Sequence, residues 1–255
     1  MSFADHFSGQ ASQYAAFRPG YPDALFTWLA AQLPINSIAW DVGCGSGQAA
    51  VALGAVLDTV VATDPSVAQL GHAVHQAHVH YTAMTAEQCA LRDRSVHLVT
   101  VAQALHWFDL DAFYAEVRRV SAPGAILAVW SYGLLQIDGV HGASRTELNR
   151  RVRDFYTNTV GTYWPPERRL VDAGYEALPF PFAELTPPAL AMTVQWTLEQ
   201  LAGYLSSWSA VARYRAARGD DPVPAFVATL ETEWGGAGKE RTIGWPLSIR
   251  VGRVL

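Results

Sequence analysis

One short segment constrains the fold of this 255-residue chain more than any other. The apolar run Ile38-Ala39-Trp40 leads into Asp41-Val-Gly-Cys-Gly-Ser-Gly47, and the helix-forming run 48–53 follows. A strand that ends in three alternate glycines and opens into a helix presents backbone N–H groups to a ligand, because no Cβ shields them. The segment therefore predicts a nucleotide-sized binding turn in an α/β domain.

The glycine spacing separates two kinds of nucleotide site. A dinucleotide loop follows Gly-x-Gly-x-x-Gly and holds a pyrophosphate at a helix N-terminus. Here Gln48 stands in the place of the third glycine, and the pattern is Asp-x-Gly-x-Gly-x-Gly. A second acid, Asp64, ends the next apolar run, where a carboxylate can accept both hydroxyls of a ribose. The simpler alternative is a tight turn and a helix-capping acid in an ordinary α/β domain.

Composition favours a soluble enzyme of small molecules. Half of the residues are hydrophobic, 16% are charged, and the formal net charge is −5. A nucleic-acid partner is not expected, because such proteins need a basic face. No apolar run approaches the ~20 residues of a membrane span, and the N-terminus does not resemble a signal peptide, so we expect a cytoplasmic protein without a membrane partner. The two cysteines and the scattered histidines at 72–80 predict no metal site.

The glycine turn resembles motif I of the Rossmann-like S-adenosylmethionine (SAM) methyltransferases. Tyr14 and Arg18-Pro19-x-Tyr21-Pro22 are similar to the opening of the trans-aconitate methyltransferase-like group within the type 11 methyltransferases. Ala86-Glu87 and the run 95–108, which ends in His106-Trp107-Phe108, look like later motifs of that group. The resemblance covers most of the chain, and its distinctive motifs lie in the first 132 residues.

Alternating apolar strands and helices through about residue 132 predict a parallel sheet covered on both faces. We expect strands at 38–42, 59–63, 79–84, 96–102 and 125–132, and helices at 22–33, 48–56, 66–76 and 111–120. Pro22 is expected at the first helical position. The resemblance implies a Rossmann-like class I methyltransferase fold, with a seven-stranded, mostly parallel sheet and an aromatic-rich cap inserted after strand five.

The chain is expected to divide into three segments. Residues 1–133 form the SAM-binding core with an N-terminal lid segment, and residues 134–240 form a substrate cap that includes a late core strand at 190–196. Helices are expected at 198–218. Residues 241–255 supply a C-terminal strand, at 246–254, that completes the sheet. A monomer or a homodimer is expected.

The resemblance also implies a set of SAM-binding residues. Asp41 and the glycines belong to the methionine end of the cofactor, Asp64 to the ribose, Ala86 and Glu87 to the adenine, and Gln103 to the region under the sulfonium. Thr85 stands where the family usually has an acid. The candidate cofactor set comprises Tyr14, Arg18, Asp41, Gly43, Cys44, Gly45, Gly47, Asp64, Pro65, Thr85, Ala86, Glu87 and Gln103.

Methyl transfer needs a nucleophile held in line with an activated methyl group. A carboxylate is ionised at neutral pH and needs only clamps and a dry pocket, whereas a hydroxyl or amine needs a base. The resemblance favours a carboxylate of a small, trans-aconitate-like acid. Hydroxyl or nitrogen methylation, a non-catalytic SAM-binding module and a nicotinamide-dependent reductase remain alternatives. His106 is the candidate catalytic residue, as a base or as a donor to an anion, and the candidate substrate-binding residues are Trp107, Trp130, Tyr132, Trp164 and Arg168.

Overall fold

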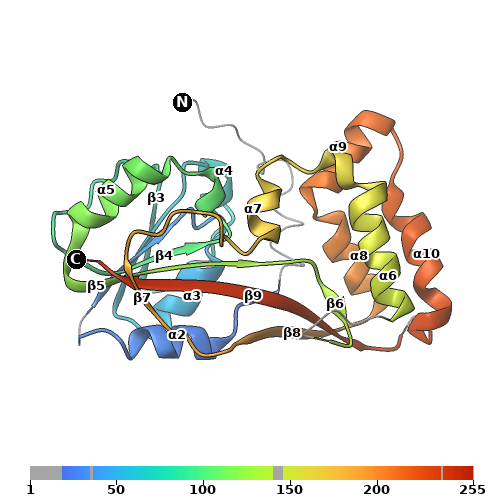
Figure 1. Cartoon of the computed structure of the whole chain (residues 1–255), viewed down its shortest axis with the longest axis horizontal. Coiled ribbons are helices and arrows are strands. Elements are labelled where there is room, and N and C mark those ends of the chain that lie inside the picture. Colours follow the sequence, from blue (N-terminus) through green and yellow to red (C-terminus); the bar gives the residue numbers. More distant parts are fainter. Residues whose placement is uncertain (1–18, 35–36, 140–145, 237, 255) are drawn as a thin grey trace.

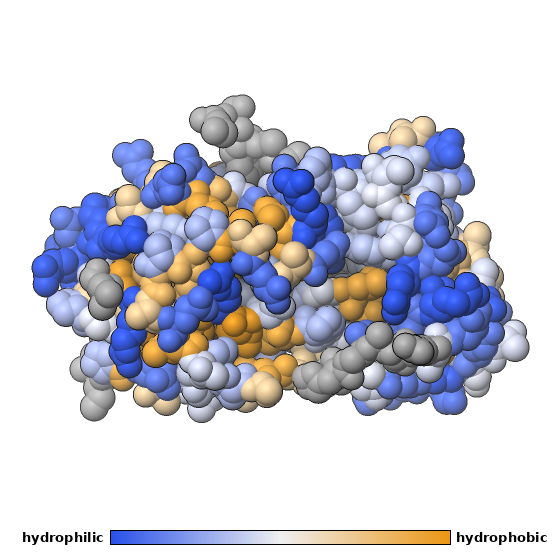
Figure 2. Space-filling view, viewed as in Figure 1, coloured by the Kyte–Doolittle hydropathy of each residue, from blue (hydrophilic) through white to orange (hydrophobic). Residues whose placement is uncertain are grey.

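The computed structural model describes residues 19–34, 37–139, 146–236 and 238–254. An α/β lobe and a helical lobe lie side by side, and the long strand β9 (Arg241–Arg253) runs from one to the other (Figure 1). The short helix α7 (Arg168–Asp172) lies between the lobes on one side of this strand. The space-filling view shows apolar residues spread over the α/β lobe and hydrophilic residues over the far end of the helical lobe (Figure 2).

The α/β lobe is built on five parallel strands in the order β3-β2-β1-β4-β5, followed by β9, which is antiparallel to β5. Their mostly buried, apolar sequences explain why both faces of the sheet are covered. The five strands are β1 (Ile38–Val42), β2 (Thr59–Thr63), β3 (Val79–Thr82), β4 (Val96–Ala102) and β5 (Ser121–Tyr132).

Helices cover both faces of this sheet. On one face Leu25 and Leu53 pack with Ala39, and on the other Phe113 packs with Trp40. Asp109 caps the helix that carries Phe113, since its Oδ1 accepts a hydrogen bond from the N–H of Ala112 at 3.3 Å. The helices of this lobe are α2 (Asp23–Ala30), α3 (Gln48–Gly54), α4 (Val67–Leu70), the 3-10 turn η2 (Leu105–Trp107) and α5 (Leu110–Val120).

The described residues form nine strands rather than the expected seven. The long strand β9 accommodates them, because it pairs with four other strands. Its C-terminal half pairs with β5 and with β7 (Ala183–Leu185). Its N-terminal half pairs with β6 (Gln136–Ile137) and with β8 (Ala191–Trp196), where the sheet extends under the helical lobe. The expected late strand is therefore β8, and it pairs away from the region of β9 that contacts β5.

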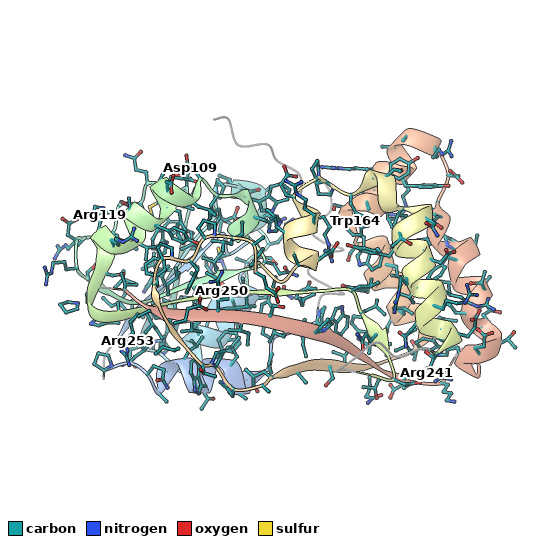
Figure 3. The ribbon with its side chains drawn as sticks, viewed as in Figure 1. Asp109, Arg119, Trp164, Arg241, Arg250 and Arg253 are labelled. Atoms are coloured by element: carbon teal, nitrogen blue, oxygen red, sulfur yellow. The ribbon has the colours of Figure 1, made fainter. Side chains whose placement is uncertain are left out.

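The helical lobe has its own apolar core, which contains Phe155, Tyr204, Trp208, Trp234 and Trp245. Its elements are α6 (Glu147–Asp154), the π-helical segment η3 (Phe155–Thr159), the 3-10 turn η4 (Gly161–Tyr163), α8 (Leu198–Ser206), α9 (Ser209–Arg218) and α10 (Pro222–Trp234). Figure 3 places Trp164 beside α7, at the side of this lobe that faces the α/β lobe.

Several expected bounds were wrong. Pro22 is the N-cap of α2 in an extended conformation rather than its first helical residue. Helix α4 is a single turn that ends before Gly71, since Val74 beyond it is 61% exposed and gives a longer helix no apolar face to bury. Strand β5 begins at Ser121, before Pro123-Gly124, with an irregular register against the start of β4. None of the described helices is both long and apolar enough to span a membrane.

Candidate active site

The parallel strands bring most of the predicted cofactor residues to one edge of the sheet. Asp41 lies near the end of β1, Asp64 follows β2, Thr85 to Glu87 follow β3, and Gln103 follows β4. Because these strands are parallel, their carboxyl ends share the edge where α/β proteins bind ligands. Tyr14 and Arg18, which were also predicted to contact the cofactor, lie outside the described residues.

The glycine turn adopts backbone conformations that other residues rarely take. Gly45 and Gly47 have φ values of +55° and +87°, in the left-handed region. A Cβ on Gly47 would lie 2.3 Å from Oη of Tyr81, so no side chain fits there without a shift. Among the described atoms, a Cβ on Gly45 would meet nothing closer than 3.9 Å, so these residues leave space for a ligand above the turn.

Asp64 binds the glycine turn directly. Its Oδ2 accepts a hydrogen bond from the N–H of Gly45 at 2.9 Å, and its Oδ1 accepts one from the N–H of Ser66 at 2.8 Å. The acid of the second strand and the turn after the first are thus one structural unit. The N–H of Gly45 is engaged by this bond, so Gly45 offers a ligand close approach rather than a donor.

Asp41 is a buried hydrogen-bond acceptor with one oxygen that has no donor among the described residues. It has no exposed surface, and its Oδ1 accepts a hydrogen bond from Oγ1 of Thr100 at 2.7 Å. Among the described residues its Oδ2 has no hydrogen-bond donor, although the nearby N–H of Ala50 lowers the pKa. Burial dominates and raises the pKa of Asp41 to about 7. Burial thus disfavours the ionised carboxylate, and a cationic group beside Oδ2 would stabilise it.

These observations fit the cofactor that the resemblance implies. SAM has an ammonium group, a ribose diol, an adenine and a sulfonium, and it needs acceptors for the first two. Asp41 would hold the ammonium group, and Asp64, beside the open space over Gly45, would hold the diol. Gly43 and Cys44 belong to the same turn, and Pro65 follows Asp64 directly.

The segment after β3 is held against the start of α5. Ala86 is buried, and Oε1 of Glu87 accepts a hydrogen bond from the N–H of Asp109 at 3.1 Å. Thr85 is exposed. The Glu87 carboxylate therefore has a structural partner, and an adenine at this edge would meet the backbone of Ala86.

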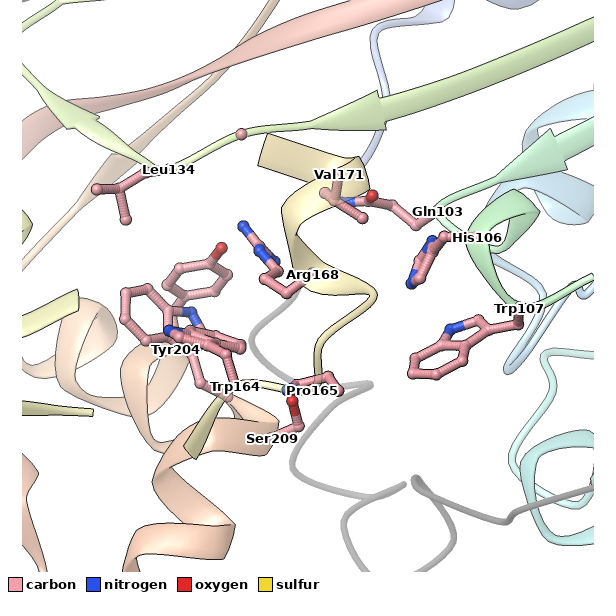
Figure 4. A pocket seen from close by; sticks show the side chains of 12 residues that line it. Gln103, His106, Trp107, Leu134, Trp164, Pro165, Arg168, Val171, Tyr204 and Ser209 are labelled. Atoms are coloured by element: carbon pink, nitrogen blue, oxygen red, sulfur yellow. The ribbon is translucent and has the colours of Figure 1, made fainter. Parts of the chain in front are cut away.

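A pocket lies between the two lobes, beside the end of β4. Gln103, His106 and Trp107 line it from the α/β lobe, and Trp164 and Arg168 line it from the other side (Figure 4). Gln103 has a left-handed φ of +58°, and its Nε2 donates to the carbonyl of Tyr132 at 3.3 Å. Its buried Oε1 has no hydrogen-bond partner in the part of the chain that the structure describes. The other lining residues are Gly133, Leu134, Pro165, Val171, Tyr204, Trp208 and Ser209.

His106 is held in place by aromatic neighbours. Its Nδ1 lies 2.8 Å from Oη of Tyr175, and its ring centroid lies 4.7 Å from that of Trp107. Burial and, as a smaller cause, the positive charge of Arg168 together lower the pKa of His106 to about 3. A neutral imidazole with so low a pKa is a weak base and remains a hydrogen-bonding group.

Arg168 is the cationic side chain of the pocket. Its Nε donates to Oη of Tyr156 at 2.9 Å and to Oδ1 of Asp172 at 3.0 Å. Its Cζ lies 4.9 Å from the ring centroid of Trp164. Among the residues that the structure describes, no acceptor is assigned to its Nη1 or Nη2. Although burial lowers the pKa of Arg168, the neighbouring Tyr156 and Asp172 raise it above its ordinary value.

Two predicted lining residues lie elsewhere. Trp130 has no exposed surface and packs edge-on against Tyr21 and Phe26, so it belongs to the core of the α/β lobe. Tyr132 is 4% exposed and packs against Trp245. Neither side chain lines the pocket, because this part of β5 is covered on both faces. The pocket does bring together Trp107, Trp164 and Arg168, and their contact with a substrate stays a prediction.

Sequence patterns predicted no role for the residues that support these groups. Tyr156, Asp172 and Tyr175 contact Arg168 or His106 from segments of the cap that lack a strong periodic pattern. Tyr204, a further lining residue, lies on α8 and was predicted only as part of a helix. The aromatic richness around Tyr163 and Trp164 was the one available signal.

Comparisons with known proteins identify the family of this chain. The model of a methyltransferase domain family (type 11) matches residues 40–129. A protein of Dictyostelium discoideum that is provisionally described as a methyltransferase is 34% identical over 230 residues, which cover 89% of this chain and 86% of that protein. A Saccharomyces cerevisiae protein, provisionally described as a SAM-dependent methyltransferase, is 25% identical over 132 residues, covering 48% of this chain and 45% of its own length.

A solved structure from Anaeromyxobacter dehalogenans, provisionally described as a type II methyltransferase, is 42% identical to this chain. It superposes with a TM-score of 0.85 and covers 94% of this chain and 99% of that one. The likeness therefore includes both lobes and not the glycine turn alone. The trans-aconitate methyltransferase-like subgroup is not resolved by these relatives. The chain belongs to the class I SAM-dependent methyltransferases of the type 11 family.

Proposed function

We propose that this methyltransferase methylates a carboxylate oxygen of a small organic acid. The observation that carries the proposal is the orientation of Arg168, whose Nε is held by Tyr156 and Asp172 while Nη1 and Nη2 have no assigned acceptor among the described residues. A guanidinium edge of two N–H groups matches a carboxylate in a bidentate pair. The pocket therefore offers a carboxylate clamp beside the cofactor edge of the sheet.

The walls of the pocket suit an ionised acceptor. When bound, SAM supplies a methyl group that its positive sulfur has already activated. Trp107, Trp164 and Trp208 exclude water, which strengthens the attraction between Arg168 and an anion. His106 is neutral and orients the acceptor by hydrogen bonding, since a carboxylate needs no base. A trans-aconitate-like acid is our first choice, and we propose a small molecule rather than a nucleic acid or a membrane as the partner.

Methylation of a hydroxyl or nitrogen is less well supported. That chemistry needs a proton acceptor, and the pKa of His106, about 3, makes this imidazole a poor one. A SAM-binding module without turnover would not need a cation inside an aromatic pocket. Turnover of alcohols or amines in place of acids would support the first alternative. SAM binding without turnover of any acceptor would support the second.

The test is methyl transfer from SAM to a panel of small acids, alcohols and amines, followed as S-adenosylhomocysteine formation. We expect turnover with one or more acids and none with the matched alcohols. The variant Arg168→Gln should lose turnover while it still binds SAM in a calorimetric titration. Arg169→Gln is the matched control, because Arg169 is exposed and does not line the pocket. Turnover of alcohols alone, or undiminished turnover by Arg168→Gln, would refute the proposal.

A further inference from the structure

We infer that Tyr156 is a positioning residue, which acts with Asp172 to aim the guanidinium of Arg168 at the acceptor carboxylate. The inference rests on the proposed function. It adds a residue outside the pocket lining to the machinery that binds the acceptor.

The three side chains form a closed hydrogen-bonded group. Oη of Tyr156 donates to the Asp172 carboxylate, with distances of 2.8 Å to Oδ1 and 2.7 Å to Oδ2. The same oxygen accepts a hydrogen bond from Nε of Arg168 at 2.9 Å. Because both partners accept from the single N–H of Nε, the guanidinium is held at this one corner, and the edge formed by Nη1 and Nη2 lies opposite.

Aromatic rings fix the plane of the same guanidinium. Cζ of Arg168 lies 4.9 Å from the centroid of Trp164 and 5.5 Å from that of Tyr156. The two rings contact each other with centroids 5.1 Å apart, and Nε1 of Trp164 donates to the carbonyl of Tyr156 at 3.4 Å. Tyr156 thus contacts Arg168 through both its hydroxyl and its ring. Figure 4 shows the guanidinium on the side of the pocket nearest Leu134 and Tyr204.

The backbone at Tyr156 is unusual. It lies in the π-helical segment Phe155–Thr159, which continues α6, and the N–H of Val160 donates to the carbonyl of Phe155 at 3.0 Å. Single π-helical turns of this kind are rare and are frequently found at functional sites. Here the irregular turn carries the ring and hydroxyl that contact Arg168.

Stability alone does not account for this group. The ion pair reaches solvent through Asp172, whose side chain is 39% exposed against 19% for Arg168, and ion pairs that contact water add little to folding. A fixed guanidinium, in contrast, loses less conformational freedom when it binds a planar anion. The geometry therefore points to acceptor binding rather than to folding as the role of the Tyr156 hydroxyl.

The test is a double-mutant cycle on acceptor kinetics. Tyr156→Phe keeps the ring and removes the hydroxyl, so we expect the KM for the acid to rise about tenfold with little change in kcat, the usual scale for a lost hydrogen bond to a charged group. SAM affinity and melting temperature should stay near the parent values. Tyr163→Phe is the matched control, because Tyr163 lies in the same lobe and its described contact is the ring of Tyr214.

The second arm of the cycle separates positioning from a structural role. With Arg168→Lys as the background, Tyr156→Phe should have little further effect on KM, because the two residues act as one unit. Equal effects in both backgrounds would overturn the inference, as would an unchanged KM in Tyr156→Phe. If Arg168→Gln itself leaves acid turnover intact, the proposed function fails, which is a separate result.

Discussion

Nδ1 of His106 and Oη of Tyr175 lie 2.8 Å apart, although 69 positions separate the two residues in the chain. This contact joins the turn after β4 to the segment that follows α7. Tyr175 is a non-glycine residue in the left-handed region, with φ of +63°, and its N–H donates to the carbonyl of Leu170 at 2.9 Å. Arg250 of β9, near the middle of the view in Figure 3, donates to the carbonyls of Tyr175 and Leu178. The helix that carries Arg168 is thereby fixed relative to His106.

The environment of His106 predicts a flat pH profile. Its pKa of about 3 keeps the imidazole neutral from about pH 5 to 9, and a carboxylate acceptor is ionised over that range. We expect kcat/KM for the acceptor, measured at saturating SAM, to show no inflection near 6.5, the ordinary pKa of histidine. An inflection there that disappears in His106→Gln would instead identify His106 as a titrating base.

The same shift predicts how stability depends on pH. The folded pKa lies below the unfolded value of 6.5, so below that value the unfolded chain binds a proton that the folded chain does not. The contribution of His106 is therefore complete above 6.5 and is lost as the pH falls toward 3. We expect the free energy of unfolding, measured with urea at about pH 5 and 7.5, to fall at the lower pH. The fall should be smaller for His106→Gln than for the parent. Equal losses would contradict the buried, neutral imidazole.

The glycine turn makes a prediction about one methyl group. Gly47→Ala places a Cβ at a φ of +87° and within 3 Å of three atoms of Tyr81. We expect a loss of about 1 to 3 kcal/mol in the free energy of unfolding, the scale of local backbone strain, together with weaker SAM binding. Gly20→Ala is the control, because no described atom lies within 4 Å of its Cβ and its φ is not in the left-handed region. An equal response of the two variants would mean that the turn tolerates a side chain.

The core of the site could be predicted from the sequence because it follows from local patterns. Apolar runs with an acid or glycines at their ends mark parallel strands, and the carboxyl ends of parallel strands meet at one edge. This argument brought Asp41, Asp64 and Gln103 together. It failed for Trp130, since a strand covered on both faces has no solvent side that a lining residue could occupy.

The residues that support the pocket could not be predicted from such local patterns. Tyr156 owes its position to a π-helical turn. Tyr175, directly after Gly174, owes its position to its own left-handed backbone conformation. Neither conformation has a strong local signal in a single sequence. Their partners, Arg168 and His106, are 12 and 69 positions away. Only the packing of the two lobes decides these contacts.

Asp41 predicts a proton released on cofactor binding. Its folded pKa of about 7 lies above the ordinary 3.8, so the carboxyl is largely protonated at about pH 6 when Oδ2 lacks a donor. The ammonium group of SAM beside it would favour the ionised form. Calorimetric titration in buffers of different ionisation enthalpy should detect net proton release at about pH 6 that fades by about pH 8.5. Asp41→Asn should abolish this release, and release that persists in the variant would assign it to another group.

Asp64 predicts which cofactor the site accepts. We expect SAM and S-adenosylhomocysteine to bind, and NADH not to bind, because the turn lacks the third glycine of a dinucleotide loop. Asp64→Asn replaces an acceptor-only group with an amide that keeps one acceptor oxygen. The variant should therefore lose its hydrogen bond either to the ribose diol or to the N–H of Gly45. The expected cost in SAM affinity is at least about tenfold, the scale for a hydrogen bond to a charged group. Asp58→Asn, at the opposite end of β2, is the matched control and should bind SAM normally. Binding of NADH in place of SAM would overturn the assignment of the turn, whereas normal SAM binding by Asp64→Asn would move the ribose contact to another residue.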